Sequence, residues 1–170
     1  MAASGWRILA GYSAPFVKAI TMTLTPFHLA LRVRDIAEAR SFYGELLGCP
    51  EGRSDTHWVD FDLFGHQLVT HLDPSLGPAG SVASHANPVD GEQVPASHFG
   101  VILAWEDFDR LLVRLESREI AFVIPPTTRF AGRRGEQRTL FVRDPAGNHL
   151  EFKTFRNPDM LFATDGLDYP

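Results

Sequence analysis

The chain is poor in cysteine, in long apolar runs and in excess positive charge, and each deficit excludes a structural feature or a class of protein. Its one cysteine, Cys49, cannot form a disulfide within the chain. No apolar run reaches the roughly 18 residues that a membrane span requires. A net charge of −5 offers no general attraction to nucleic acid. We therefore expect a cytoplasmic protein that binds neither membranes nor nucleic acids.

The composition is that of a globular domain. Hydrophobic residues make up 44% of the 170 residues and charged residues 22%, which is enough to build a buried core. Residues 1–21 contain no acidic residue and lack the pattern of a secretory signal, so we treat them as an N-terminal arm. Residues 158–170 are treated as a C-terminal tail, which leaves one domain over 22–157.

Residues 22–72 have the periodicity of a strand, a helix and further strands. Apolar and polar residues alternate strictly from Phe27 to Val33, which predicts a half-buried strand. Asp35 fits the cap of a helix whose apolar stripe ends at Gly48. Two strands are expected next, at 58–64 and 67–72.

A linker rich in proline, glycine, serine and alanine spans 73–95, and residues 96–157 then repeat the order of elements. The expected elements are a strand at 97–103, a helix at 105–119, a short strand at 121–124 that ends at two prolines, a mobile basic loop at 127–137 and a hairpin at 139–155. The hairpin turn is Asp144-Pro145-Ala146-Gly147-Asn148, in which glycine and asparagine tolerate positive φ.

The two halves resemble each other directly in sequence. His28-Leu29-Ala30-Leu31 matches His98-Phe99-Gly100-Val101 at an offset of 70, and Gly65-His66-Gln67-Leu68-Val69 matches Gly147-Asn148-His149-Leu150-Glu151 at an offset of 82. Such a repeat predicts an α+β fold of two tandem βαβββ modules. We expect each helix to cover one face of its sheet, and the free faces to form a curved cup.

Three candidate metal ligands share the free face. Strand alternation places His28, His98 and Glu151 there. Each has a simpler explanation, since a histidine can pack in the core and a glutamate can pair with a cation on a solvated face. Two histidines at equivalent positions of a repeat, with a carboxylate on a last strand, instead favour a metal site of two histidines and one carboxylate. Such a site leaves positions open for substrate and for water or dioxygen.

The segments FHLALRV, SHFGV and FVRDPAGNHLEFK resemble the vicinal oxygen chelate superfamily. This superfamily includes glyoxalase I, extradiol dioxygenases, fosfomycin-resistance enzymes and bleomycin-resistance proteins. The resemblance runs from about Pro26 to Phe155. The segments WVDFDLFGHQLVTH and GEQRTLFVRDPAGNHLEFK are more narrowly similar to an uncharacterised bacterial group described as predicted extradiol-type dioxygenases.

The resemblance implies a cup around a divalent metal bound by His28, His98 and Glu151. Fe(II) is the first candidate metal, with Mn(II), Zn(II) and Ni(II) as alternatives. It also implies a small-molecule substrate and a homodimer, in which the cup can combine His28 of one subunit with His98 and Glu151 of the other. The implied activity is that of a dioxygenase-like oxidoreductase. The alternatives are a glyoxalase-type isomerase or lyase, a thiol transferase, and a metal-free drug-sequestering protein.

The sequence departs from the family patterns at three positions. Val69 stands where the first module of glyoxalase I has a fourth ligand, and valine cannot bind a metal. Phe141 and Gly132 stand where the extradiol signature has tyrosine and histidine. We therefore predict that His71, on the free face, is the general acid or base, although a surface histidine near the linker would look the same.

Four residues are expected to line the substrate site: Arg32, Gln67, Phe141 and Lys153. The first shares a face with His28 and the last shares a face with Glu151. Their positive charges favour an anionic substrate, unless both cations pair with carboxylates of the sheets.

Overall fold

The computed structural model describes residues 24–89 and 91–163, and the first half forms one mixed four-stranded sheet. Its strands are β1 (His28–Val33), β2 (Glu51–Asp55), β3 (Trp58–Leu63) and β4 (His66–Leu72). Their order is β1-β4-β3-β2, with β1 parallel to β4 and the other pairs antiparallel. β2 is exposed along its whole length, so it lacks the apolar alternation that would locate it in the sequence.

The second half builds the same sheet again. Its strands are β7 (Phe99–Ile102), β8 (Ile124–Arg129), β9 (Gln137–Arg143) and β10 (His149–Phe155). Their order is β7-β10-β9-β8, and β7 is parallel to β10. The same order and the same strand directions in both halves confirm the predicted pair of βαβββ modules.

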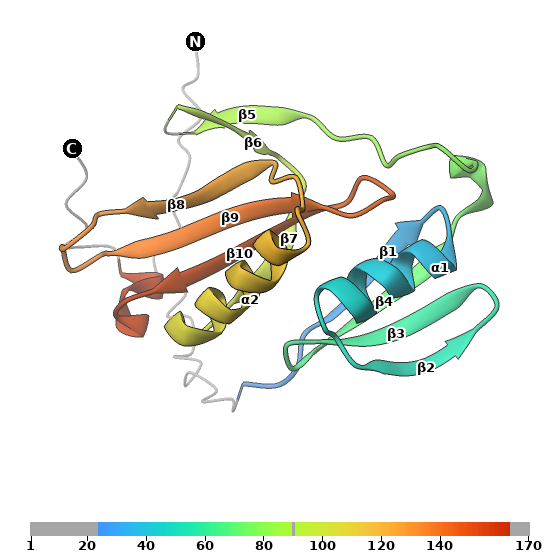
Figure 1. Ribbon diagram of the computed structural model, residues 1–170, viewed down its shortest axis with the longest axis horizontal. Coiled ribbons are helices and arrows are strands. Elements are labelled where there is room, and N and C mark those ends of the chain that lie inside the picture. The colour runs from blue at the N-terminus through green and yellow to red at the C-terminus, as the bar shows by residue number, and fades with distance from the viewer. Residues whose placement is uncertain (1–23, 90, 164–170) are drawn as a thin grey trace, which may run out of the picture.

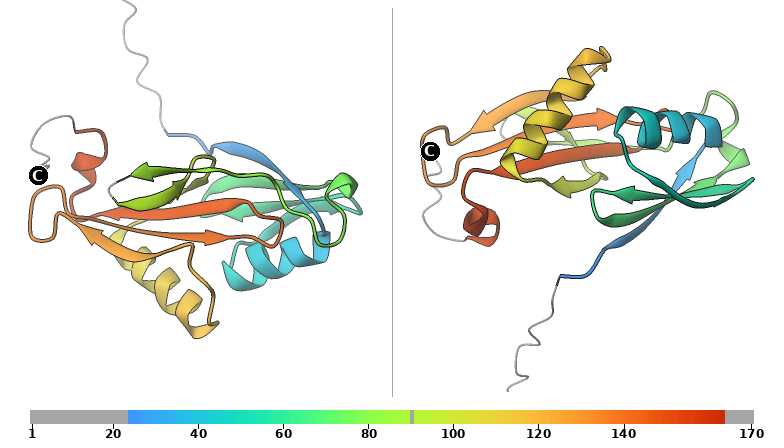
Figure 2. Two further views of the ribbon diagram at one scale, coloured as in Figure 1. Left: turned by 90° about the horizontal axis from the view of Figure 1, so that it is seen from above. Right: turned by 60° about the horizontal axis from the view of Figure 1, so that its bottom comes forward.

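The main helices of both modules lie on one side of the two sheets (Figures 1 and 2). The first begins as α1 (Ile36–Ala39), where the Asp35 carboxylate accepts a hydrogen bond from the backbone N–H of Glu38 at 2.8 Å, and continues as the π-helix η1 (Arg40–Leu46). The second is α2 (Trp105–Ser117). Their apolar faces pack on the sheets and form the core. No helix in residues 24–89 and 91–163 is long and apolar enough to cross a membrane.

The segment predicted as a linker contains structure that its composition does not reveal. A short 3-10 helix η2 (Pro74–Leu76) is followed by a hairpin of β5 (Ala86–Val89) and β6 (Glu92–Pro95). The left view of Figure 2 shows this hairpin on the side of the sheets opposite the helices. The hairpin therefore lies over the face on which the metal ligands are expected.

The predicted short strand at 121–124, which was expected to end at Pro125-Pro126, is wrong except at Ile124. β8 continues through both prolines and pairs with β9 as far as Arg129, which lies opposite Gln137. Proline is tolerated because β8 is an edge strand, and because the pairing register shifts between Ile124 and Thr127. The predicted basic loop is correspondingly shorter.

The turn between β9 and β10 joins the two modules. Its buried Asp144 accepts a hydrogen bond from the Tyr43 hydroxyl of η1 at 2.8 Å, and Asn148 Nδ2 donates to the Arg32 carbonyl oxygen of β1 at 3.0 Å. Gly147 has φ of +91°, and a Cβ there would lie 2.8 Å from the side chain of Ser81. The predicted hairpin turn is thus confirmed, and it also fixes one module against the other.

Candidate metal centre

The helix-free side of the two sheets presents the residues that alternation predicts. In β1, the side chains of His28 and Arg32 are exposed, while Leu29 and Leu31 pack against the core. In β10, Leu150 and Phe152 are fully buried, so Glu151 between them points to the opposite face. Each module thus turns its predicted ligands away from its helix.

His98 and Glu151 form the centre of the candidate site. The Nε2 atom of His98 lies 3.3 Å from Oε2 of Glu151. Its Nδ1 lies 2.7 Å from the Pro95 carbonyl oxygen, which can only accept, so Nδ1 carries a hydrogen. In the neutral ring, Nε2 then directs a lone pair at a carboxylate, and a proton or a metal ion between them makes the contact attractive. Two ligand atoms at right angles on one cation lie about 3 Å apart, so this separation fits a shared metal.

The second oxygen of Glu151 is held by two other side chains. The Thr139 hydroxyl donates to Oε1 at 2.6 Å, and Lys153 Nζ lies 3.1 Å from the same atom. These contacts leave Oε2 as the oxygen that faces His98. The carboxylate is therefore oriented before any cation arrives, which is the usual arrangement around metal ligands in proteins.

Gly100 permits the close approach of β7 to β10 beside this pair. It lies opposite Glu151 in the parallel ladder, and a Cβ at this position would sit 1.6 Å from the Glu151 carbonyl oxygen. No side chain can occupy that space without moving one strand. Glycine at position 100 therefore sets the spacing that brings His98, two residues earlier, next to Glu151.

His28 lies on the other sheet and has different contacts. Its Nδ1 lies 2.7 Å from Oε1 of Gln67 on the adjacent strand β4. Among the described residues of a single chain, no group of three or more histidine, cysteine or acidic side chains is placed to hold a metal. One chain thus brings together two of the three predicted ligands, His98 and Glu151, and keeps His28 apart from them.

The other predicted site residues each have different neighbours in the structure. Arg32 pairs with Asp73 at 3.0 Å, so its predicted role toward substrate has a competing partner. His71 is exposed on β4, where it lies between Arg32 and Trp58 in the ladder. Phe141 is buried and meets the His98 ring edge-on at 5.2 Å, which makes it a wall of the site.

A cavity of about 510 Å³ opens over this face of the second sheet. Besides His98 and Glu151, polar residues such as Thr139 and Gln137 line it from β9, and Val94 of the β5–β6 hairpin and Met160 of the C-terminal 3-10 helix η3 (Pro158–Phe162) add apolar surface. The alternation of β9 could have identified Thr139, which shares the phase of Phe141. Nothing in the sequence pattern indicates that the linker and the tail approach the same cavity.

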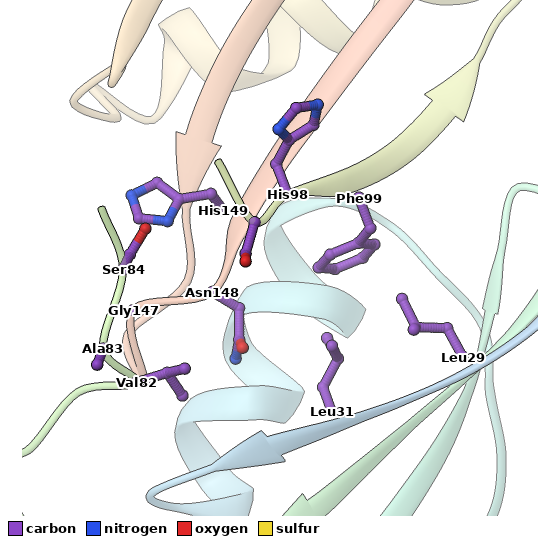
Figure 3. A pocket seen from close by; sticks show the side chains of 11 residues that line it. Leu29, Leu31, Val82, Ala83, Ser84, His98, Phe99, Gly147, Asn148 and His149 are labelled. Carbon is purple, nitrogen blue, oxygen red and sulfur yellow. The ribbon is translucent and has the colours of Figure 1, made fainter. Parts of the chain in front are cut away.

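A second cavity of about 330 Å³ lies where the two modules meet (Figure 3). Leu29 and Leu31 of β1 and Phe99 of β7 give it an apolar wall, and Asn148 contributes from the β9–β10 turn. Figure 3 shows the ring of His98 directed away from the two leucines. We place the candidate metal centre in the larger cavity, because that is where the imidazole and the Glu151 carboxylate meet.

His149 is a neighbouring histidine that shares the face of Glu151 on β10. Partial burial, and secondarily the positive charge of Arg143, lower the pKa of His149 below the usual value for histidine. Its ring is therefore neutral at physiological pH. It adds no positive charge to the site.

A comparison with family models identifies the family of the chain. Residues 25–152 match the model of the Glyoxalase/Bleomycin resistance protein/Dioxygenase superfamily, and the chain belongs to this family. Members of the family include dioxygenases, glyoxalase I lyases and fosfomycin-resistance transferases, and they commonly bind divalent metals and small-molecule substrates. A comparison with curated proteins finds no match.

Solved structures extend the likeness over most of the chain. A glyoxalase/bleomycin resistance protein/dioxygenase from Alicyclobacillus acidocaldarius is 34% identical, with a TM-score of 0.62 over 81% of this chain and 96% of that one. A fosfomycin resistance protein from Listeria monocytogenes is 16% identical, with a TM-score of 0.56 over 82% and 100%. A lactoylglutathione lyase from Agrobacterium tumefaciens is 20% identical, with a TM-score of 0.52 over 81% and 96%. The last two show the fold alone.

Proposed function

We propose that the protein is a divalent-metal-dependent, dioxygenase-like enzyme whose metal is held by His28, His98 and Glu151. The observation that carries this proposal is the 3.3 Å approach of His98 Nε2 to Glu151 Oε2, with the far side of each group already fixed by Pro95 and Thr139. Imidazole nitrogen and carboxylate oxygen are the donors that Fe(II) and related cations bind.

The third ligand comes from a second copy of the chain in this proposal. His28 is exposed on one face of the first sheet, and among residues 24–89 and 91–163 of one chain it is separate from the other two proposed ligands. A homodimer that places this face over the second sheet of its partner completes two equivalent sites, since a two-fold interface repeats every contact. Ile102, which is exposed and shares the strand phase of His98, gives such an interface apolar area.

The substrate is a small anion with adjacent oxygens. A bound cation supplies Lewis acidity to the oxygens that chelate it. Lys153, close to the Glu151 carboxylate, offers a positive charge to an anionic substituent of the substrate. His71, on the same open face as His28, is the general acid or base that transfers a proton during the reaction. Val69 at the position equivalent to Glu151 disfavours the four-ligand chemistry of a glyoxalase-type lyase.

Metal content tests the proposal most directly. The full chain, purified without a histidine tag and analysed by mass spectrometry, should carry one divalent ion per site. Either His98→Ala or Glu151→Gln should lose it, because two protein ligands rarely retain a divalent ion against water. A metal-free parent that also takes up no added Fe(II), Mn(II), Zn(II) or Ni(II) would contradict the proposal and favour a drug-sequestering protein.

Mixing two defective variants tests whether the site is shared. His28→Ala and Glu151→Gln should each lose the metal when purified alone. If the subunits are unfolded together and refolded, random pairing restores about one quarter of the sites, because each mixed dimer has one intact site. A site built within one chain would give no recovery, since every chain would lack one ligand.

A further inference from the structure

Asp60 is a buried carboxylate that is not a ligand in the proposed metal site. It is 6% exposed, on β3, opposite Val69 in the ladder with β4. Its Oδ2 lies 3.3 Å from Nε2 of Gln67 and 3.4 Å from a guanidinium nitrogen of Arg53. The Arg53 side chain is 82% exposed, so solvent screens that pair. The amide of Gln67 is the closer of the two partners of this buried charge.

The chemistry of these groups determines which way the amide points. An ionised carboxylate only accepts hydrogen bonds, so Gln67 must present its NH2 group to Asp60 and its oxygen to the other side. On that side, the amide oxygen lies 2.7 Å from His28 Nδ1. An amide oxygen also only accepts, so Nδ1 must carry a hydrogen. In the neutral ring the lone pair is then on Nε2.

We propose that Asp60 and Gln67 are a positioning pair, which holds His28 in the Nδ1–H tautomer and presents its bare Nε2 to a divalent cation. The inference rests on the proposed function in one respect, namely that the species bound by His28 Nε2 is a divalent metal ion. It reassigns Gln67, which the sequence suggests as a substrate-binding residue, to the support of a metal ligand. Outer partners of this kind commonly change metal affinity by about 10- to 100-fold.

The second module reaches the same result by another route. There the Pro95 carbonyl oxygen accepts from His98 Nδ1, also at 2.7 Å, and again leaves Nε2 bare. A backbone carbonyl is fixed by the chain, whereas a glutamine amide can rotate by half a turn and exchange donor for acceptor. The first module therefore needs the carboxylate of Asp60 to prevent that rotation.

Long-range proton–nitrogen NMR of the metal-free, full-length protein tests the tautomer independently of metal binding. In mildly alkaline buffer, His28 of the parent should show the Nδ1–H form. Gln67→Leu should shift it toward a mixture of tautomers and weaken the binding of added Zn(II) by about 10- to 100-fold. His98 is the internal control, and its tautomer should be the same in the parent and in Gln67→Leu.

Exchanging the carboxylate and the amide between positions 60 and 67 should restore the tautomer of His28. In Asp60→Asn/Gln67→Glu, the new amide can donate to the new carboxylate, whose other oxygen still accepts from His28 Nδ1. The double variant should recover the Nδ1–H form. An Nε2–H tautomer in the parent, or no response to Gln67→Leu, would overturn the inference. If the tautomer responds while no variant or parent binds metal, the positioning pair stands and the proposed metal function fails.

Discussion

The two modules have the same strand order but place a carboxylate differently on their open faces. In the second module, Glu151 occupies the middle of the last strand, with the ring of Phe141 opposite it on the neighbouring strand. In the first module the arrangement is reversed, because Val69 occupies the last strand and Asp60 lies opposite. Moving the carboxylate by one strand changes its role from a candidate metal ligand to a partner of Gln67. A duplicated scaffold can thus keep both histidines and still give its halves different functions.

The modules also differ in what covers them. The β5–β6 hairpin and η3 contribute to the cavity over the second sheet. The corresponding face of the first sheet leaves His28, Arg32 and His71 exposed. The second module therefore has the larger part of the proposed binding site, whereas the first contributes the proposed ligand His28 from an exposed surface. Substitutions at equivalent positions of the two modules test this division of roles.

Substituting the same position of the last strand in each module gives the largest expected contrast. Glu151→Gln should abolish retention of the metal during purification, because this module would then offer the cation no negatively charged ligand. Val69→Ala, at the equivalent position of the first module, should keep the metal. Metal content by mass spectrometry separates the two results. Equal metal content in both variants would show that the modules do not differ in this way.

His71 occupies the position equivalent to Lys153 of the second module, and its removal should affect turnover rather than metal binding. His71→Ala should leave metal affinity unchanged and lower turnover of a substrate by about 10² to 10⁴, the usual cost of losing a positioned acid or base. His57→Ala, which removes an exposed histidine from the β2–β3 turn, is the matched control and should behave like the parent. Steady-state kinetics with metal titration checks both. Parent-like turnover in His71→Ala would assign the proton transfer to water or substrate.

The sequence was sufficient for the fold because its signals are local and repeated. Alternation at Phe27–Val33 and the turn around Gly147 each depend on a few neighbouring residues, and the repeat at offsets of 70 and 82 orders them into two modules. The β5–β6 hairpin was missed because its residues are largely exposed and lack alternation. The strand predicted at 121–124 lies instead at Ile124–Arg129, because proline usually stops a strand, and an edge position relaxes that rule.

Part of the candidate site could be predicted because strand phase, like the signals for the fold, is local. Strand phase predicts that His28 and Glu151 lie on the helix-free side of their sheets, as they do, but it does not give the distance between the two sheets. The separation of His28 from His98 and Glu151 within one chain depends on how the modules pack, which no local pattern encodes. Gln67 was predicted to bind substrate. Its hydrogen bond to His28, like that of Thr139 to Glu151, was not predicted, because a hydrogen bond between neighbouring strands depends on register and side-chain rotamer.

The contact between modules should make a measurable contribution to stability. Tyr43→Phe removes the hydroxyl that donates to buried Asp144, and should lower the free energy of unfolding by about 1 to 3 kcal/mol at neutral pH. Burial raises the pKa of Asp144, and the Tyr43 hydroxyl opposes that rise by stabilising the charged form. The loss caused by the variant should therefore shrink as acid protonates Asp144 in the folded state. Urea unfolding at neutral and mildly acidic pH measures it, and a loss independent of pH would contradict this reasoning.

The smallest expected effect concerns how the second module holds its carboxylate. Thr139→Val keeps the shape of the side chain and removes the hydroxyl that donates to Glu151 Oε1 at 2.6 Å, so the carboxylate should lose part of its fixed orientation. Metal affinity should fall about tenfold, at the low end of the range for such partners.

Thr154→Val is the matched control, because this buried hydroxyl has no hydrogen-bond partner among the described residues. Its removal should leave metal affinity unchanged and raise stability. Competition with a chelator of known affinity gives both values. Equal affinities in the two variants would mean that Lys153 alone orients Glu151, and that the threonine contributes only packing.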